Sequence, residues 1–198
     1  MKRRLVLGLI ALLATIAVAW TVVVPRLQPH VFHGSVIQSL TRAPEIDLVS
    51  THGGVVGLDD FNGRLTVVYF GYTYCPDICP ATLATLDRAL DSLPPDLADE
   101  VQVVMVSIDP ERDTVEYLRE YLGYFNEEFM GLTGDPGDVA RVATTYGVYF
   151  AANDGTAATG YTIDHTASLM VIDREGHLRL VFPPELTAED IAADLEHL

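Results

Sequence analysis

The feature that most constrains this chain is a buried-strand pattern that runs directly into its only two cysteines. Residues 65–72 read Leu-Thr-Val-Val-Tyr-Phe-Gly-Tyr, a nearly continuous β-branched and aromatic run. Such a run is typical of a strand that is buried on both faces of a sheet. Cys75 and Cys79 follow at once, and a helical pattern begins after Pro80. We therefore predict a central strand and a helix that meet at a cysteine pair.

Strand and helix patterns alternate through the rest of the domain. Strand–helix–strand connections make the early strands parallel, whereas the late hairpin is antiparallel. This order predicts an α/β sandwich with a thioredoxin-like fold. The predicted elements are a hairpin, strand, helix, strand, helix, helix, hairpin and helix, in residues 45–58, 65–72, 81–93, 101–108, 113–125, 139–146, 167–182 and 187–198.

Two of these helices carry capping signals. Asp113 followed by Glu116 predicts a capping-box-like start for the second helix, and Thr187 is placed to cap the last one. The segment from Asp109 to Thr114 is therefore interpreted as a strand end and a helix cap, and no site is assigned to it.

The N-terminal segment predicts export of the domain. Residues 5–24 contain no charge and, at about 1.5 Å per residue, can cross a hydrocarbon core of about 30 Å. The basic residues 2–4 precede this span, which predicts a single-pass protein of the inner membrane with a cytoplasmic N-terminus and a periplasmic domain. The alternative for residues 1–24 is a cleaved signal peptide, because Ala17-Val18-Ala19 has the required small-x-small form.

Residues 25–43 have no sustained helical or strand period, and we interpret them as a tether to a domain over residues 44–198. His30 and His33 lie in this tether and are expected to be solvated. The chain has 28 acidic residues against 12 Lys and Arg, giving a formal net charge of -16. Because nucleic-acid binding depends on cations, this charge argues against a nucleic-acid partner.

The cysteine pair points to thiol or metal chemistry. A spacing of four places Cys75 and Cys79 one helical turn apart, so both sulfurs can meet at one ion or form a disulfide. The N-terminus of a helix lowers the thiol pKa and favours the thiolate. A stabilising disulfide, dithiol–disulfide exchange and metal binding are the three interpretations that this pattern allows.

His165 favours the metal interpretation. It lies just before the late hairpin, in a loop that a thioredoxin-like sheet returns to the first strand–helix junction. Thiol oxidoreductases usually carry a proline in this region, and residues 164–171 contain none. Two thiolates and one imidazole suit three-coordinate Cu(I), whereas zinc would want a fourth ligand. Asp77 or Asp164 could supply it, but Asp77 more simply serves the first helical turn. Asp164 more simply hydrogen-bonds the backbone or orients the imidazole from outside the ligand shell.

Several motifs in order resemble the Sco/SenC family of copper chaperones for cytochrome c oxidase assembly. The resemblance extends over more than a hundred residues. The motifs are Gly-Tyr-Thr-Tyr-Cys-Pro-Asp-Ile-Cys-Pro at 71–80, Val-Ser-Ile-Asp-Pro-Glu-Arg-Asp-Thr at 106–114, Gly-Leu-Thr-Gly at 131–134, Asp-His-Thr at 164–166 and Leu-Met-Val-Ile-Asp at 169–173.

The resemblance implies a domain anchored by one N-terminal helix, with Cys75, Cys79 and His165 on the family's copper ligands. It implies binding of Cu(I) and also of Cu(II). It further implies a role at the binuclear copper A centre of cytochrome c oxidase subunit II, either copper delivery or reduction of that centre's cysteines. The copper donor is not identified by these motifs.

Two other functions are compatible with the same residues. A membrane-anchored thiol-disulfide oxidoreductase would use the redox disulfide of Cys75 and Cys79 on cysteines of partner proteins, and a peroxidase would use Cys75 alone. The stretch over residues 151–160 is rich in Ala, Gly and Thr. We expect it to form a mobile loop that lets His165 swing away during copper transfer.

Overall fold

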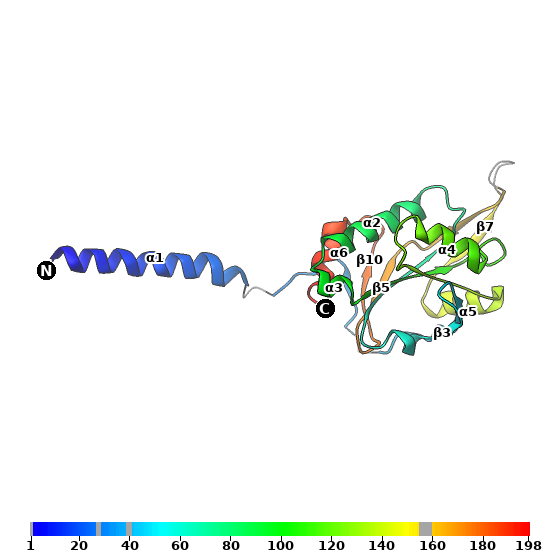
Figure 1. Ribbon diagram of the computed structural model, residues 1–198, viewed down its shortest axis with the longest axis horizontal. Coiled ribbons are helices and arrows are strands. Elements are labelled where there is room, and N and C mark those ends of the chain that lie inside the picture. Colours follow the sequence, from blue (N-terminus) through cyan, green and yellow to red (C-terminus); the bar gives the residue numbers. More distant parts are fainter. Residues whose placement is uncertain (1, 27–28, 39–40, 155–159) are drawn as a thin grey trace. The chain divides into compact units, whose positions relative to one another are not determined.

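The computed structural model describes residues 2–26, 29–38, 41–154 and 160–198. The chain divides into two compact units, Met1–Val31 and Phe32–Leu198. The first unit holds helix α1 (Lys2–Arg26) (Figure 1). Within the described residues, no helix meets the length and hydropathy that a membrane span requires. The span expected at residues 5–24 therefore stays a prediction.

The second unit is built on an eight-stranded sheet with the strand order β1-β10-β9-β4-β5-β6-β2-β3. The strands β4, β5 and β6 are parallel neighbours, and β9 and β10 form an antiparallel hairpin, as predicted. A separate two-stranded sheet joins β7 (Phe150–Asn153) to β8 (Thr162–His165). The strands of the large sheet are β1 (Ser35–Val36), β2 (Leu48–Ser50), β3 (Val55–Val56), β4 (Leu65–Gly71), β5 (Val101–Ser107), β6 (Met130–Thr133), β9 (Leu169–Ile172) and β10 (Leu178–Phe182).

Helices cover both faces of the large sheet. Figure 1 shows α2, α4 and α6 on one face and α5 on the other. The sheet is therefore the middle layer, and every residue of β4 and β5 is buried, as the sequence pattern predicts. The helices are α2 (Ile78–Ser92), α3 (Pro95–Ala98), α4 (Val115–Gly123), α5 (Pro136–Thr145) and α6 (Ala188–Leu195), with a 3-10 helix η1 over Leu58–Phe61.

The start of α4 differs from the prediction. Thr114 is the capping residue, and its hydroxyl accepts a hydrogen bond from the Tyr117 N–H at 3.2 Å. Asp113 is fully buried instead, and its carboxylate accepts hydrogen bonds from Thr73 and Ser107. A capping pattern cannot reveal this, because the partners of Asp113 lie on other elements. The predicted cap of α6 by Thr187 is confirmed.

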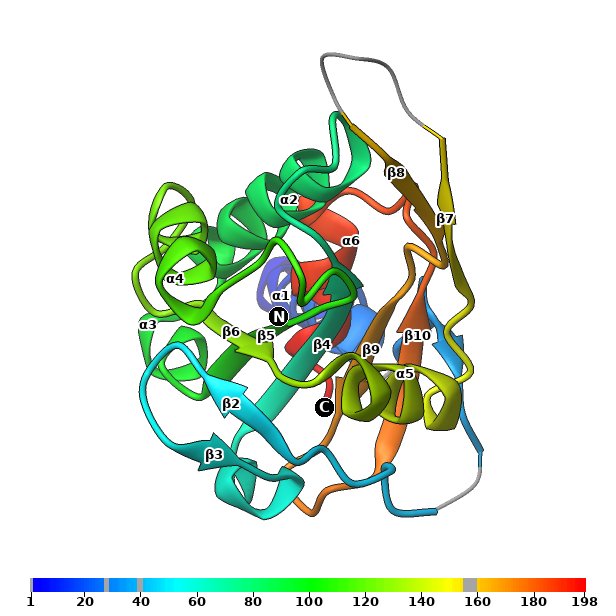
Figure 2. The same ribbon diagram turned by 90° about the vertical axis from the view of Figure 1, so that its right-hand side faces the viewer.

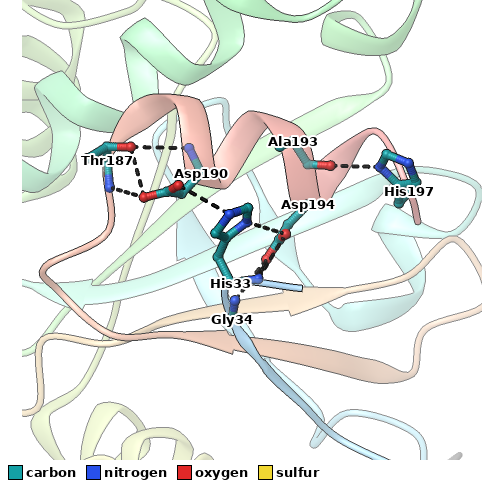
Figure 3. A network of polar contacts seen from close by, with 7 residues as sticks. All are labelled: His33, Gly34, Thr187, Asp190, Ala193, Asp194 and His197. Atoms are coloured by element: carbon teal, nitrogen blue, oxygen red, sulfur yellow. Dashed lines mark hydrogen bonds and ion pairs between the residues drawn. The ribbon is translucent and has the colours of Figure 1, made fainter. Parts of the chain in front are cut away.

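The folded unit begins before the expected boundary at residue 44. Phe32 is its first residue, and β1 pairs with β10 at the edge of the sheet. Asp194 on α6 holds this segment, because its carboxylate accepts hydrogen bonds from the backbone N–H groups of His33 and Gly34 (Figure 3). Residues 32–38 and 41–43 thus belong to the domain unit, although their local pattern resembles a tether.

His33 is exposed to solvent, as expected, but it also contacts acidic side chains, which the sequence did not predict. Its Nδ1 lies 3.0 Å from Asp194 Oδ1, and its Nε2 lies 3.4 Å from Asp190 Oδ1 (Figure 3). The hydrogen bond with Asp194 is the main cause of a raised His33 pKa. Asp194 is 161 residues away in the chain, so no local pattern could predict this contact.

Candidate metal centre

The junction between β4 and α2 places both cysteines. Cys75 lies in the loop that follows β4, and Cys79 lies in the first turn of α2. The Cys79 N–H lies 3.4 Å from Cys75 Sγ and donates a hydrogen bond to it. Both cysteines are free, with no disulfide between them, so both sulfurs are available to bind a metal.

His165, the last residue of β8, faces this cysteine pair. Its Nε2 lies 3.5 Å from Cys79 Sγ, although the two residues are 86 positions apart. The ligand atoms of Cys75, Cys79 and His165 all lie within 4.8 Å of one another. The structure thus brings together the three residues that the sequence singled out.

The three donor atoms fit one copper ion. At the metal–ligand distances of about 2.0–2.3 Å known for the related ion Zn²⁺, three ligands around one ion lie about 3.5–4 Å apart. The observed cluster needs only a small contraction to reach this geometry. Two sulfurs and one imidazole nitrogen form a soft donor set that favours Cu(I). Among the described residues, no carboxylate joins this cluster as a fourth ligand.

The orientation of His165 is set by its neighbours in space. Its Nδ1 lies 3.1 Å from the carbonyl oxygen of Thr166, so a proton on Nδ1 leaves Nε2 free to bind a metal. The rings of Tyr69 and Tyr72 lie edge-on to the imidazole, with centroids 6.2 and 5.9 Å away. These contacts hold the imidazole against the cysteines.

Asp164 does not orient the imidazole as the sequence analysis expected. Its side chain is exposed, and among the described residues its carboxylate has no hydrogen bond. Successive side chains of a strand point to opposite faces, so Asp164 and His165 on β8 face opposite ways. The carbonyl of Thr166 takes the orienting position instead.

The two thiols have opposite pKa shifts. The pKa of Cys75 is lowered to about 4, mainly by the hydrogen bond from the Cys79 thiol and further by His165 and the N–H groups of Asp77 and Cys79. The same hydrogen bond, together with burial, raises the pKa of Cys79 above its ordinary value. At neutral pH the pair therefore carries one thiolate, on Cys75, and one proton, on Cys79.

Sequence reasoning did not single out Gly71 at the end of β4. A Cβ atom at this position would lie 2.7 Å from Tyr69 Cε1 and 3.1 Å from Cys79 Sγ. Any larger residue would therefore push against the sulfur of Cys79. A glycine in an otherwise bulky strand is a known signal of close approach, and it could have indicated this role.

An open cleft of about 480 Å³ lies beside the cysteines and His165. Tyr72, Cys75, Pro76 and His165 are among the residues that line it. Cys75 is 9% exposed, whereas Cys79 is completely buried behind it. A partner that enters the cleft therefore reaches Cys75 and His165 before it reaches Cys79.

The sequence of this chain is similar to those of known proteins. A model of the SCO1/SenC family matches residues 38–198. Protein sco1 of Schizosaccharomyces pombe is 35% identical over 147 residues, which cover 73% of this chain and 56% of that protein. The chain therefore spans little more than half the length of this relative.

Solved structures are similar over most of the domain. The structure of Bradyrhizobium japonicum ScoI with copper bound is 37% identical, with a TM-score of 0.71, and the match covers 79% of this chain and 98% of that chain. The thioredoxin domain of a thiol-disulfide oxidoreductase from Bacteroides vulgatus is 20% identical, with a TM-score of 0.58 over 81% of this chain and 96% of that chain. The second similarity bears on the fold alone, and it confirms the predicted thioredoxin-like architecture.

Proposed function

The chain belongs to the SCO1/SenC family, and we propose that it is a copper carrier whose ligands are Cys75, Cys79 and His165. The observation that carries this proposal is the convergence of these three donor atoms within 4.8 Å from two distant segments. The similarity to ScoI with copper bound supports copper as the metal. Copper is the cargo of this site, in the Cu(I) state and also as Cu(II).

The ligand set allows copper to be held and then released. A three-coordinate ion leaves one side open, so a thiolate of an acceptor protein can replace the ligands one at a time. Cys75 and His165 line the cleft and are replaced first, whereas the buried Cys79 is the last ligand to be replaced. Because Cys75 is already a thiolate, copper binding at neutral pH releases one thiol proton, from Cys79.

We propose the binuclear copper A centre of cytochrome c oxidase subunit II as the recipient. The motifs shared with the family support a role in the assembly of this oxidase. A reduced cysteine pair could deliver copper to that centre or reduce its cysteines. Oxidation of Cys75 and Cys79 to a disulfide would stop copper loading, because metal binding needs both sulfurs reduced.

We expect His165→Ala to weaken Cu(I) binding at the cysteine pair. Loss of the imidazole removes one of three ligands, and it should lower the affinity at least as much as the tenfold to hundredfold typical of an outer-shell contact. The measurement is an anaerobic Cu(I) titration of the reduced full chain against a competing chelator. One copper ion per chain is expected for the unmodified protein.

His52→Ala is the matched control for this substitution. His52 lies in the turn between β2 and β3, at the opposite edge of the sheet from the β9–β10 hairpin, and its side chain is exposed. This variant should bind copper as tightly as the unmodified chain. Weak binding by the unmodified chain, unchanged in His165→Ala, would contradict the copper-carrier proposal.

A thiol-disulfide oxidoreductase is the second candidate function, and the thiolate on Cys75 favours it. A low thiol pKa makes Cys75 able to attack a disulfide near neutral pH, and Cys79 can then resolve the mixed disulfide. Reduction of a protein disulfide at an unchanged rate by His165→Ala would support this function. The same variant thus separates the two candidates, because copper binding loses a ligand, whereas the largest contribution to the low Cys75 pKa comes from Cys79 and is kept.

We also propose that residues 5–24 anchor the protein in the inner membrane with the domain in the periplasm. The uncharged run and the basic residues before it support this topology. We expect the full chain to sediment with washed membranes and a chain of residues 32–198 to stay in the supernatant. A mature N-terminus at Trp20, measured by mass spectrometry, would instead show cleavage after Ala19.

A further inference from the structure

The strand that carries His165 is not part of the large sheet. Within the described segments, β8 pairs only with β7, in a two-stranded sheet that is separate from the eight-stranded one (Figure 2). The cysteines, by contrast, follow β4 in the middle of the large sheet. Among the described residues no backbone ladder joins the two sheets, so the distance between His165 and the cysteines depends on side-chain contacts and on the short link from His165 to Leu169 of β9.

Three residues form a closed cluster at the start of β8. The Arg112 guanidinium donates from Nη1 to the Tyr161 carbonyl oxygen at 3.0 Å and from Nε to the Asp109 carboxylate. The Tyr161 hydroxyl donates to the other carboxylate oxygen of Asp109 at 2.5 Å. The guanidinium also lies over the Tyr161 ring, 3.7 Å from its centroid. Each residue of this Asp109–Arg112–Tyr161 cluster thus contacts the other two.

The cluster also reaches the loop that carries Cys75. The Arg112 guanidinium lies 4.7 Å from the ring centroid of Tyr74 and 5.8 Å from that of Tyr72. These two tyrosines flank Thr73, just before Cys75. Tyr72 adds a second link, because its hydroxyl accepts a hydrogen bond from the Ile163 N–H of β8 at 3.1 Å. Arg112 therefore contacts both segments that supply the proposed copper ligands.

Burial and charge make the interactions within the Asp109–Arg112–Tyr161 cluster strong. Asp109 is 2% exposed, so its interaction with Arg112 is little screened by water. Burial and the hydrogen bond to Asp109 raise the pKa of Tyr161 to about 12, so the phenol keeps its proton and donates throughout the neutral range. Charge-assisted hydrogen bonds of this kind are roughly twice as strong as neutral ones.

Few other polar contacts hold β8 in place. In the described part of the chain, β8 and the residues beside it have four groups of polar contacts beyond the pairing with β7. These are the contacts of Tyr161 with Asp109 and Arg112, of Ile163 with Tyr72, of His165 with Cys79 and of Thr166 with Tyr149. The segment from Asp109 to Thr114 is interpreted from the sequence as a strand end and a cap. Through Asp109 and Arg112 it also contacts the start of β8.

We infer that Asp109 and Arg112 are positioning residues that hold His165 over the cysteine pair by clamping Tyr161 at the start of β8. This inference rests on the proposed copper function for its consequence, since the imidazole matters only if it binds the metal. Without the clamp, Cys75 keeps its place in the loop after β4 and Cys79 keeps its place on α2, but the imidazole loses its fixed distance to them. Removal of these clamping contacts should therefore lower only the part of the copper affinity that comes from His165.

A double-mutant cycle between Arg112 and His165 tests this inference. In the reduced full chain, Arg112→Gln should weaken Cu(I) binding about tenfold to hundredfold, the range for a group that orients a ligand. In the His165→Ala background the same substitution should change the affinity less than about threefold. An equal loss in both backgrounds would overturn the inference, because it would show a general structural effect.

A milder variant covers the case in which Arg112→Gln does not fold. Tyr161→Phe removes only the hydroxyl that donates to Asp109, and it should weaken binding in the same sense by about threefold to tenfold. The matched controls are Arg119→Gln, whose guanidinium binds the Thr51 carbonyl at 2.7 Å, and Tyr146→Phe, whose hydroxyl binds the Pro44 carbonyl at 2.7 Å. Both controls should keep the copper affinity, and an unchanged affinity in Tyr161→Phe would overturn the inference.

A measurement without copper separates this inference from the proposed function. Amide hydrogen exchange at Ile163 and His165 should be faster in Arg112→Gln and Tyr161→Phe than in the unmodified apo protein, with no change in Arg119→Gln. If the chain does not bind copper, the proposed function fails, while faster exchange still supports the clamp. Unchanged exchange in both variants would show that Asp109 and Arg112 do not hold β8.

Discussion

Replacing Cys79 with serine should abolish tight Cu(I) binding. The serine hydroxyl is a hard oxygen donor that keeps its proton at neutral pH, so a soft ion loses one of its two thiolates. Cys79 is fully buried, and the chain contains no cysteine besides Cys75 and Cys79 that could replace it. We expect an affinity loss of more than about 100-fold, above the upper end for an outer-shell contact.

Ala89→Ser is the matched control for this prediction. Ala89 is also fully buried on α2, so this variant buries the same hydroxyl in the same helix away from the cysteines. It should lose stability in a thermal unfolding measurement but keep one tight Cu(I) site. Retention of tight binding by Cys79→Ser, within about tenfold of the unmodified protein, would contradict the assigned ligand set.

The second large effect concerns the pH dependence of Cys75 reactivity. The Cys75 pKa of about 4 lies well below the ordinary value for a thiol, so the thiolate is present above about pH 5 and is lost as the pH falls through 4. Alkylation of Cys75 by iodoacetamide should therefore have nearly the same rate constant from pH 5 to pH 8. An ordinary thiol would react about 1000-fold faster across the same range, because its thiolate fraction rises tenfold per pH unit.

Mass spectrometry can follow this reaction at Cys75 alone, since Cys79 is buried and keeps its proton. Cys79→Ala is the informative variant, because it removes the hydrogen bond that contributes most to the low pKa of Cys75. The rate in this variant should regain a dependence on pH between 5 and 8. A tenfold rise per pH unit in the unmodified apo protein would show that Cys75 is an ordinary thiol.

Most of the fold followed from local patterns. The buried run at residues 65–72 and the apolar spacing after Pro80 predicted β4 and α2, because burial on both faces and helical periodicity are visible in a single segment. The predicted boundary at residue 44 missed β1, since a two-residue edge strand has too little pattern to detect. Residues 151–153, expected as part of a mobile loop, form most of β7, and residues 155–159 lie outside the described part.

Part of the candidate site could also be predicted from the sequence. The cysteine spacing and the His165 motif indicated the three donor residues before their distances were known. The residues that support the site could not be predicted in this way, because Gly71, Asp109 and Arg112 contact atoms of other segments. Asp113 shows the same limit, since its local pattern suggests a cap while its carboxylate binds Thr73 and Ser107.

The sequence by itself determined the order of the main strands and helices of the domain, the cysteine pair at the end of the central strand and the histidine before the last hairpin. It did not determine β1, α3, β7 or β8. Periodicity and spacing are properties of neighbouring residues, so they can be read without a structure. Only the tertiary structure decided that His165 lies 3.5 Å from Cys79 and that Tyr161 is clamped by residues about 50 positions earlier. These contacts depend on how two separate sheets pack. The packing of distant segments cannot be predicted from the periodicity of the sequence.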